Sequence, residues 1–341
     1  MSRSASPLKP VNRRTFLRIV ATTAAVGACW QLGLFSGNPK LQVARRSQPI
    51  MGTYLNLTVY GRDRDECEKA IDSTIKRMLA LEGTLSRHME TSQVFRLNST
   101  GKLASPSREL LEVLDLSHKL SRQTDGAFDV TVMPLLAIHT ELHGEYGSPD
   151  AENLKAARSS IGYEHLEWDT SEVRFNKPGM SITLDGIGKG FIVDQGVATL
   201  KEHGFQNVYV EAGGDLMVSG AKADGSPWRI GIQNPRREKT MAPVVVAVSD
   251  RAVATSGDYF QAFTPDLRHH HILDPHTGFS APELASATIT APNVAMADGL
   301  ATATMVLGHT RSIELLESLE GCEGYLIDKQ LNSYHSSGFF S

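Results

Sequence analysis

The chain has 341 residues, of which 41% are apolar and 21% are charged, and its formal net charge is −4. That length is enough for one large domain or two smaller ones with a hydrophobic core. The small net charge, and basic residues that are scattered beyond the N-terminus, argue against nucleic-acid binding. The three cysteines contain no CxxC pair, which excludes a zinc ribbon and a disulfide-based scaffold.

Two of these cysteines, Cys67 and Cys322, lie in the body of the chain. They could form one disulfide in an oxidising compartment, but only if the fold brings them together. Two partly buried free thiols agree at least as well with the sequence, so the pairing stays open here.

Residues 1–40 have the composition of an export signal. Arg13 and Arg14 form a pair in a basic segment, and a weakly apolar run follows over residues 19–35. This pattern is typical of a twin-arginine signal, which predicts export of the folded protein to the periplasm. A permanent transmembrane helix is the poorer interpretation, because it needs about 20 strongly apolar residues.

Small residues precede Cys29 in the order Val26-Gly27-Ala28-Cys29. This resembles a lipoprotein cleavage box, in which lipid is attached to the cysteine thiol. A plain cysteine beside an ordinary cleavage site is equally consistent with the pattern. Lipid anchoring through Cys29 is therefore an open alternative, and residues 41–341 are expected to form the exported domain.

Apolar spacing and end signals predict the main elements of the exported part. Helices are expected over residues 65–85, 107–123, 151–161, 191–203 and 297–307. Strands are expected over 48–60, 208–211, 228–232 and 244–248, and a polar loop over 139–150. The strands cluster in runs instead of alternating with helices, which favours an α+β fold over a doubly wound parallel sheet.

Residues 184–190, Leu-Asp-Gly-Ile-Gly-Lys-Gly, form a glycine-rich turn that leads into a helix. Glycines let the backbone approach a ligand closely, and a helix N-terminus offers free N–H groups to an anion. Lys189 could add a positive charge beside a phosphate. The spacing fits neither the Walker loop nor the GxGxxG dinucleotide motif, so a plain structural turn is the alternative.

Asp298 and Thr302 are four residues apart, so on a helix their side chains point to one face. A carboxylate and a hydroxyl are hard oxygen ligands, which suit Mg²⁺ better than Zn²⁺. The alternative is that Asp298 caps the helix while Thr302 packs.

Three consecutive histidines, residues 269–271, precede a turn. On a strand His269 and His271 would face one way and His270 the other, which argues against a shared metal. One of them could act as a general base near neutral pH. Residues 124–134, expected as a turn and a strand, and residues 254–259 also hold carboxylates, but such clusters are common in plain turns.

Taken together and in order, these segments resemble the ApbE family of flavin transferases, from about Ser47 to Ser341. The matching segments are residues 51–53, 85–98, 126–129, 185–194, 211–215, 255–259, 271–278 and 297–302. The resemblance implies an α+β fold of mixed sheets and packed helices, with a cleft for FAD and Mg²⁺. It also implies transfer of FMN from FAD to a Ser or Thr hydroxyl of a target flavoprotein, with release of AMP.

The same resemblance implies roles for individual residues. Asp298, Thr302 and the Gly186 carbonyl would hold Mg²⁺. His271 would take the proton of the attacking hydroxyl, with Asp258 as a second candidate. The expected FAD contacts are Met51, His88, Ala127, Phe128, Asp129, Thr183, Asp185, Lys189 and Ile272. His88 stands where many members of the family have an aromatic residue that stacks on the flavin.

The resemblance does not identify the molecule that accepts FMN. The acceptor would be an exported or membrane flavoprotein, and the export signal makes one of a nitrous oxide reductase system a candidate. Water could replace the protein hydroxyl, which would make the chain a Mg²⁺-dependent FAD pyrophosphatase. A flavin-binding lipoprotein without enzymatic activity is the third alternative.

Overall fold

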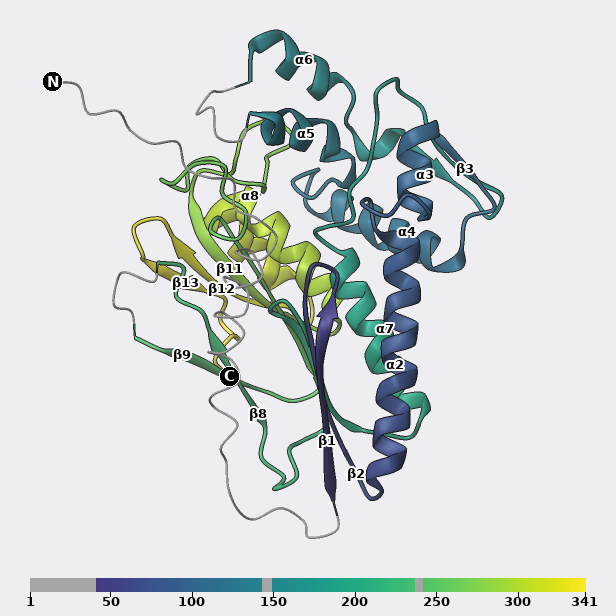
Figure 1. Cartoon of the computed structure of the whole chain (residues 1–341). Helices are drawn as coiled ribbons and strands as arrows, with labels where there is room; N and C mark the ends of the chain where they lie inside the picture. The colour runs from purple at the N-terminus through teal and green to yellow at the C-terminus, as the bar shows by residue number, and fades with distance from the viewer. Residues whose placement is uncertain (1–40, 143–148, 237–241) are drawn as a thin grey trace, which may run out of the picture.

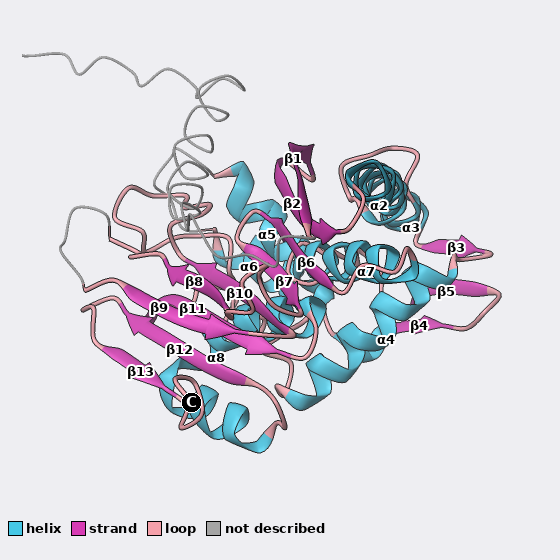
Figure 2. Cartoon of the chain, turned by 90° about the horizontal axis from the view of Figure 1, so that it is seen from below, coloured by secondary structure: helices cyan, strands magenta, loops and turns pink. Residues whose placement is uncertain are grey.

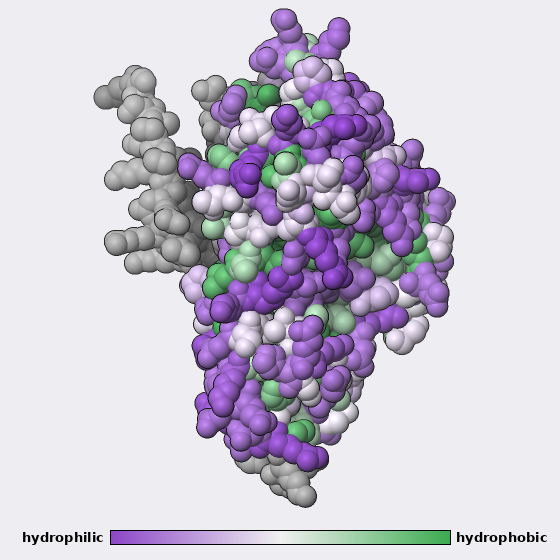
Figure 3. Space-filling model, turned by 90° about the vertical axis from the view of Figure 1, so that its right-hand side faces the viewer, coloured by the Kyte–Doolittle hydropathy of each residue, from purple (hydrophilic) through white to green (hydrophobic). Residues whose placement is uncertain are grey.

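The computed structural model describes residues 41–142, 149–236 and 242–341 (Figure 1). The expected export signal and the cleavage box at Cys29 fall in residues 1–40, outside the described residues. Within the described part of the chain, no helix is both long and apolar enough to cross a membrane. The face that carries α2 (Arg64–Leu85) is largely hydrophilic, with only scattered apolar side chains (Figure 3).

The core of the fold is an eight-stranded sheet, in which every pair of neighbouring strands is antiparallel. In spatial order its strands are β1 (Gln42–Ile50), β2 (Thr53–Gly61), β6 (Asn207–Ala212), β7 (Asp215–Ser219), β10 (Arg251–Gly257), β11 (Leu284–Ala291), β12 (Glu323–Asp328) and β13 (Ser333–His335). Two small sheets add β3 (Lys102–Ala104), β5 (Glu172–Phe175) and β4 (Leu166–Trp168), and β8 (Trp228–Ile232) with β9 (Val244–Val248).

Three helices pack on one face of this sheet, and the β8–β9 hairpin lies on the other (Figure 2). The three are α2 (Arg64–Leu85), α7 (Gly188–Glu202) and α8 (Val294–Ser318). The remaining helical elements are α3 (Gln93–Thr100), α4 (Arg108–Gln123), η1 (Val130–Val132), α5 (Met133–Glu141), α6 (Ala151–Ser159) and η2 (Tyr163–His165).

Strand β10 shows how the two faces are separated. Ala252 and Ala254 belong to the core beneath the helices, whereas Val253 packs with Trp228 and Val248 of the hairpin. This alternation is the period of two that a strand imposes on its side chains. The small alanines let the helices approach the sheet closely. The fold class expected from the clustering of strands is confirmed.

The strand expected over residues 48–60 is instead a hairpin. Ile50 pairs with Thr53, and Met51 and Gly52 form the two-residue loop with φ values of 48° and 70°. The alternating apolar residues Leu55, Leu57 and Val59 all lie in β2, and β1 has no such alternation, so the pattern did not reveal the reversal. Glycine tolerates the left-handed conformation, but a methionine there is strained.

All five expected helices are present, with altered ends. The first turn of α7 includes Gly188 and Gly190, and α8 continues to Ser318 across a kink at Gly308, where φ is 74°. Two expectations are wrong: the loop predicted from residue 139 begins inside α5, and residues 130–132 form η1 instead of a strand.

The two described cysteines are free and buried. Cys67 lies on α2, and its Sγ and the Phe205 ring both lie close to Gly61. The Cys322 thiol lies 3.8 Å from the sulfur of Met296. The disulfide alternative is therefore wrong, and the free-thiol alternative is confirmed.

Helix α7 contacts the N-terminal end of α8 backbone to backbone. A Cβ atom on Gly190 would lie 2.5 Å from the Val294 carbonyl oxygen and 2.9 Å from the Ala295 Cα. One turn later, the Asp194 carboxylate accepts the Val294 N–H at 2.8 Å and the Ala295 N–H at 2.9 Å. Burial raises the pKa of Asp194 to about 6. It is therefore ionised at neutral pH and complements the helix dipole of α8.

This contact predicts different outcomes for two glycines of α7. Gly190→Ala should lower the free energy of unfolding by about 2 kcal/mol, because the new methyl group meets backbone that cannot yield locally. Gly196→Ala is the matched control: its Cβ would meet the Met78 sulfur at 2.8 Å. A methionine side chain can adapt, and alanine favours the helix by about 1 kcal/mol. Urea unfolding measures both, and equal stability of the two variants would contradict the close contact.

Candidate functional site

The glycine turn ahead of α7 closes on itself through two backbone hydrogen bonds. The Leu184 carbonyl accepts the N–H of Ile187 at 3.1 Å and of Gly188 at 2.6 Å. This leaves Asp185 and Gly186 at the tip. The expectation of a tight turn that leads into a helix is confirmed.

The tip of the turn meets helix α8 at Gly186. A Cβ atom on Gly186 would lie 2.9 Å from the Thr302 hydroxyl oxygen and 3.4 Å from the Phe128 ring. The absence of a side chain at this position is what allows the approach. The structure thus brings together Gly186, Phe128 and Thr302, which the sequence placed in three separate motifs.

Asp298 lies one turn before Thr302 on α8 and is buried. Its Oδ2 accepts the Gly190 N–H at 3.1 Å, while Oδ1 has no described hydrogen bond. Burial, reinforced by the nearby Asp215 carboxylate and opposed by Lys189, raises the pKa of Asp298 to about 8. A buried carboxylate of this kind gains most from a cation placed beside it.

Lys189 forms an ion pair with Asp215, and its Nζ also lies 3.4 Å from the Ala212 carbonyl oxygen. Burial alone would lower the pKa of Lys189, but the charges of Asp215 and Asp298 outweigh it and raise the pKa. Lys189 is thus held beneath the site by Asp215, a contact that the sequence did not predict. Its charge balances two buried carboxylates.

The donors around Gly186 are all oxygen atoms. They are the Thr302 hydroxyl, the Ser256 hydroxyl 3.3 Å from it, and the carboxylate of Asp298, one helical turn before Thr302. Such hard donors suit Mg²⁺, which usually completes its shell with water and substrate phosphate. Across the described ranges no group of three or more His, Cys, Asp or Glu side chains is arranged for a metal. The residues present therefore fit a Mg²⁺ ion that shares its coordination with a bound phosphate.

The segment from Ala127 to Asp129 is buried beside this turn. Asp129 accepts the N–H and hydroxyl of Thr131 through Oδ1, at 2.8 and 2.7 Å, and the Tyr163 N–H through Oδ2 at 3.0 Å. Burial raises its pKa, and these bonds oppose the shift. Asp129 caps η1 and joins it to η2, so it supports the segment beside the glycine turn from inside the protein.

Thr183 supports the turn from the other side, since its hydroxyl accepts the Asp185 N–H at 3.1 Å. Its own N–H donates to the Val130 carbonyl at 2.8 Å. These bonds link the strand-like segment before the turn to η1.

Met51 and His88 are both held by the last turn of α2. The Met51 N–H donates to the Glu82 carboxylate at 3.0 Å, and the His88 N–H donates to the Ser86 hydroxyl at 3.2 Å. Glu82 and Ser86 are one helical turn apart. The His88 side chain is exposed, whereas Met51 packs against the core.

The three histidines have different surroundings. His270 is buried, its Nε2 lies 3.0 Å from the Ala281 carbonyl oxygen, and burial lowers its pKa to about 3. Its Nδ1 accepts the N–H of buried Ile272 at 3.4 Å. The His270 side chain is therefore part of the core, and only isolated bridges replace the expected strand.

The His271 N–H donates to the Gln261 carbonyl at 3.0 Å, while its Nδ1 is buried without a hydrogen-bond partner among the described residues. Burial lowers its pKa to about 4, although the Asp185 carboxylate favours the charged form. His271 is thus neutral at pH 7, and one ring nitrogen can accept a proton.

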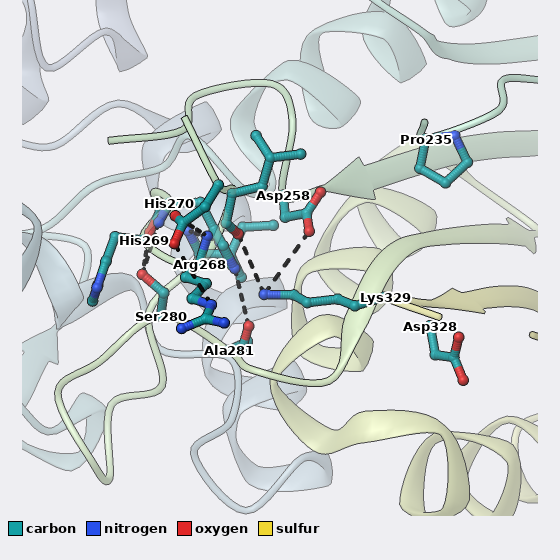
Figure 4. Close-up of polar contacts among 12 residues, drawn as sticks. Pro235, Asp258, Arg268, His269, His270, Ser280, Ala281, Asp328 and Lys329 are labelled. Carbon is teal, nitrogen blue, oxygen red and sulfur yellow. Dashed lines mark hydrogen bonds and ion pairs between the residues drawn. The ribbon is translucent and has the colours of Figure 1, made fainter. Parts of the chain in front are cut away.

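Asp258 lies fully buried in a different environment. Arg236 donates to both carboxylate oxygens, at 2.8 and 2.7 Å, and Lys329 approaches one of them at 3.9 Å. Figure 4 shows the Lys329 side chain extending toward Asp258. Lys329 also donates to the Leu267 carbonyl at 3.3 Å, which anchors the loop that leads to His271.

With both oxygens held by Arg236, Asp258 is poorly placed to accept a proton from a substrate. The sequence around Asp258 did not reveal this ion pair, and the role of Asp258 as the second candidate base stays a prediction. The sequence gave no role to Glu82 or Arg87. Arg87 pairs with Asp185 at 2.7 Å across 98 residues, a separation that no local pattern indicates.

Comparisons with known proteins identify the family of this chain. Residues 51–326 match the ApbE family. The FAD:protein FMN transferase of Vibrio cholerae is 32% identical over 281 residues, covering 80% of this chain and 84% of that protein. The protein of the same name from Treponema pallidum is 29% identical over 337 residues, covering 92% and 91%.

The crystal structure of the Pseudomonas stutzeri flavinyl transferase ApbE in its apo form superposes with a TM-score of 0.78 at 29% identity. The superposition covers 89% of this chain and 99% of that one. The family match thus extends from the Met51 hairpin to β12, and the fold agrees over most of the chain. The chain belongs to the ApbE family.

Proposed function

We propose that this chain transfers the FMN part of FAD to a Ser or Thr hydroxyl of another protein, in a Mg²⁺-dependent reaction that releases AMP. The observation that carries this proposal is the contact of the glycine turn with Thr302, one helical turn from buried Asp298. The names of the relatives from Vibrio cholerae and Treponema pallidum support the same activity.

In this reaction the acceptor hydroxyl oxygen forms a bond to the FMN-side phosphorus, and the bond from that phosphorus to the AMP oxygen breaks. When bound, Mg²⁺ supplies positive charge beside the pyrophosphate, where negative charge grows on the leaving oxygen. Asp298, Thr302 and the Gly186 carbonyl would hold it. The Lys189–Asp215 ion pair lies beneath the site and offsets part of the negative charge around Asp298.

His271 takes the proton of the attacking hydroxyl. It suits this role because it is neutral at pH 7 and its Nδ1 makes no described hydrogen bond. The Asp185 carboxylate favours the protonated form of the ring as the proton arrives. A loose phosphoryl-transfer transition state needs little basicity, so a low pKa is tolerable.

The FAD ligand would lie along the residues that surround the glycine turn. Phe128 and Ala127 line one wall, and Met51 and His88 approach from the end of α2. Asp129, Thr183 and Ile272 act indirectly, because each is buried and hydrogen-bonded within the protein.

We also propose export through the Arg13-Arg14 signal, with lipid on Cys29 as an open alternative. A periplasmic enzyme would find its acceptors among exported or membrane flavoproteins, of which those of a nitrous oxide reductase system are one candidate. The sequence of the signal is the support for this location.

The direct test is incubation of the purified chain with FAD, Mg²⁺ and a candidate acceptor protein. Intact-mass spectrometry should show a gain of one FMN unit on the acceptor and an equal amount of AMP, and EDTA should prevent both. Free FMN and AMP without a mass gain on any acceptor would sink the transferase and leave a pyrophosphatase. Bound but uncleaved FAD would indicate the flavin-binding alternative.

The metal assignment is tested by two threonines of α8. Thr302→Val should lower kcat at least about 10-fold and raise the Mg²⁺ concentration needed, since even indirect supports of metal ligands contribute that much. Thr304→Val is the matched control, because the Thr304 hydroxyl is buried and has no described hydrogen-bond partner. This second variant should keep full activity. Equal activity of the two variants would refute the metal site.

Substitution of His271 should affect catalysis, whereas substitution of Asp258 should affect stability. His271→Gln should lower kcat about 10²- to 10⁴-fold with little change in stability. Asp258→Asn should instead lower the free energy of unfolding by about 3 kcal/mol, because two cations lose their partner. The pH profile of kcat in the wild type should be flat above about pH 5 and fall as the pH approaches 4, where His271 becomes protonated. A His271→Gln variant with normal kcat would rule out this base.

A further inference from the structure

Arg87 joins two segments of the site. It follows the C-cap of α2, directly before His88, and its Nε donates to Oδ2 of Asp185 at 2.7 Å. The Asp185 side chain is 51% exposed at the tip of the glycine turn, whereas the Arg87 side chain is only 20% exposed. Arg87 is thus held against the turn instead of extending into solvent.

The ion pair occupies only one part of the guanidinium. Among the described residues, Asp185 is the sole hydrogen-bond partner of the Arg87 side chain, and the bond uses Nε alone. The Nη1 and Nη2 groups therefore remain able to donate. A guanidinium that is fixed at Nε presents these two nitrogens as a planar fork, which matches two oxygens of a phosphate.

Arg87 lies near the proposed metal site because its partner Asp185 is the residue before Gly186. Asp185 precedes Gly186, which contacts Thr302 and Phe128. The Arg87–Asp185 ion pair therefore lies one residue from the place where the turn meets α8.

The charge at the site requires a cation of this kind. Asp185, Asp215 and Asp298 are carboxylates, and Lys189 is already paired with Asp215. A pyrophosphate adds further negative charge, which one Mg²⁺ ion cannot balance alone. Arg87 supplies a positive charge whose donors are still available.

We propose that Arg87 is a substrate-binding residue of this chain, which donates from Nη1 and Nη2 to the pyrophosphate of FAD while Asp185 clamps its Nε. Asp185 is then a positioning residue that acts through Arg87. This inference rests on the proposed FAD site and adds the side chain that recognises the phosphates.

The test is a set of binding titrations on the full-length chain in Mg²⁺ buffer without acceptor. The probes are FAD and ADP, which contain the pyrophosphate, and riboflavin, which has no phosphate. Arg87→Gln should weaken FAD and ADP binding about 10- to 100-fold, as expected for lost charge-assisted hydrogen bonds, and leave riboflavin binding unchanged. Arg87→Lys keeps the charge without the fork and should give an intermediate loss.

Arg108→Gln is the matched control. Arg108 also donates from Nε to a carboxylate at 2.7 Å, that of Glu112, but on the exposed surface of α4. This control should bind all three probes as the wild type does. Unchanged ADP affinity in Arg87→Gln, or an equal loss of riboflavin affinity, would overturn the proposal.

The role of Asp185 is tested in two backgrounds. Asp185→Ala should weaken ADP binding when Arg87 is present, because the fork is no longer held. In the Arg87→Gln background the same change should leave ADP binding equal or tighter, since only a negative charge is removed. An equal loss in both backgrounds would show that Asp185 does not act through Arg87.

These readouts do not depend on turnover. A wild-type chain that binds FAD and ADP but transfers no FMN would refute the proposed reaction while leaving the test of Arg87 intact. A wild-type chain that binds neither nucleotide would refute both.

Discussion

The contact between α7 and the start of α8 is the constraint on which the site depends. Because Gly190 has no side chain, its backbone meets Val294, and its N–H reaches Asp298. Asp194 fixes the first turn of α8 in the same contact. The glycine turn ahead of α7 and the side chains of Asp298 and Thr302 on α8 are thereby held together. Groups that are already in place lower the cost of binding the proposed Mg²⁺ and phosphate.

The charged groups form two separate sets with different purposes. Asp298, Asp215 and Lys189 lie beneath the glycine turn. Lys189 pairs with Asp215, so the negative charge of Asp298 is only partly offset and can attract a further cation. Asp258 is fully compensated by Arg236 and by Lys329, which also holds the loop that ends at His271. One set adjoins the proposed metal site and the other holds a loop, although the sequence presents both as carboxylates near glycines.

Much of the fold could be predicted because its signals are local. The helices begin at polar caps such as Ser107 and end where apolar spacing stops, and strands that cluster in runs indicate an α+β fold. The Asp298 and Thr302 pair could be predicted because helical spacing places them on one face. Arg87 with Asp185, and Lys189 with Asp215, could not, because the fold alone determines which distant charges meet. The hairpin at Met51 was missed because β1, unlike β2, has no alternation of apolar residues that would mark it as a strand.

The hairpin tip shows where stability and function diverge in this chain. Met51 adopts a left-handed backbone that costs roughly 1–2 kcal/mol for a residue with a Cβ, and its neighbour Gly52 adopts the same conformation without that cost. Selection for stability alone would favour a second glycine at position 51. A methionine kept there against that preference implies that its side chain contributes something that a glycine cannot, and that the strain is tolerated in exchange.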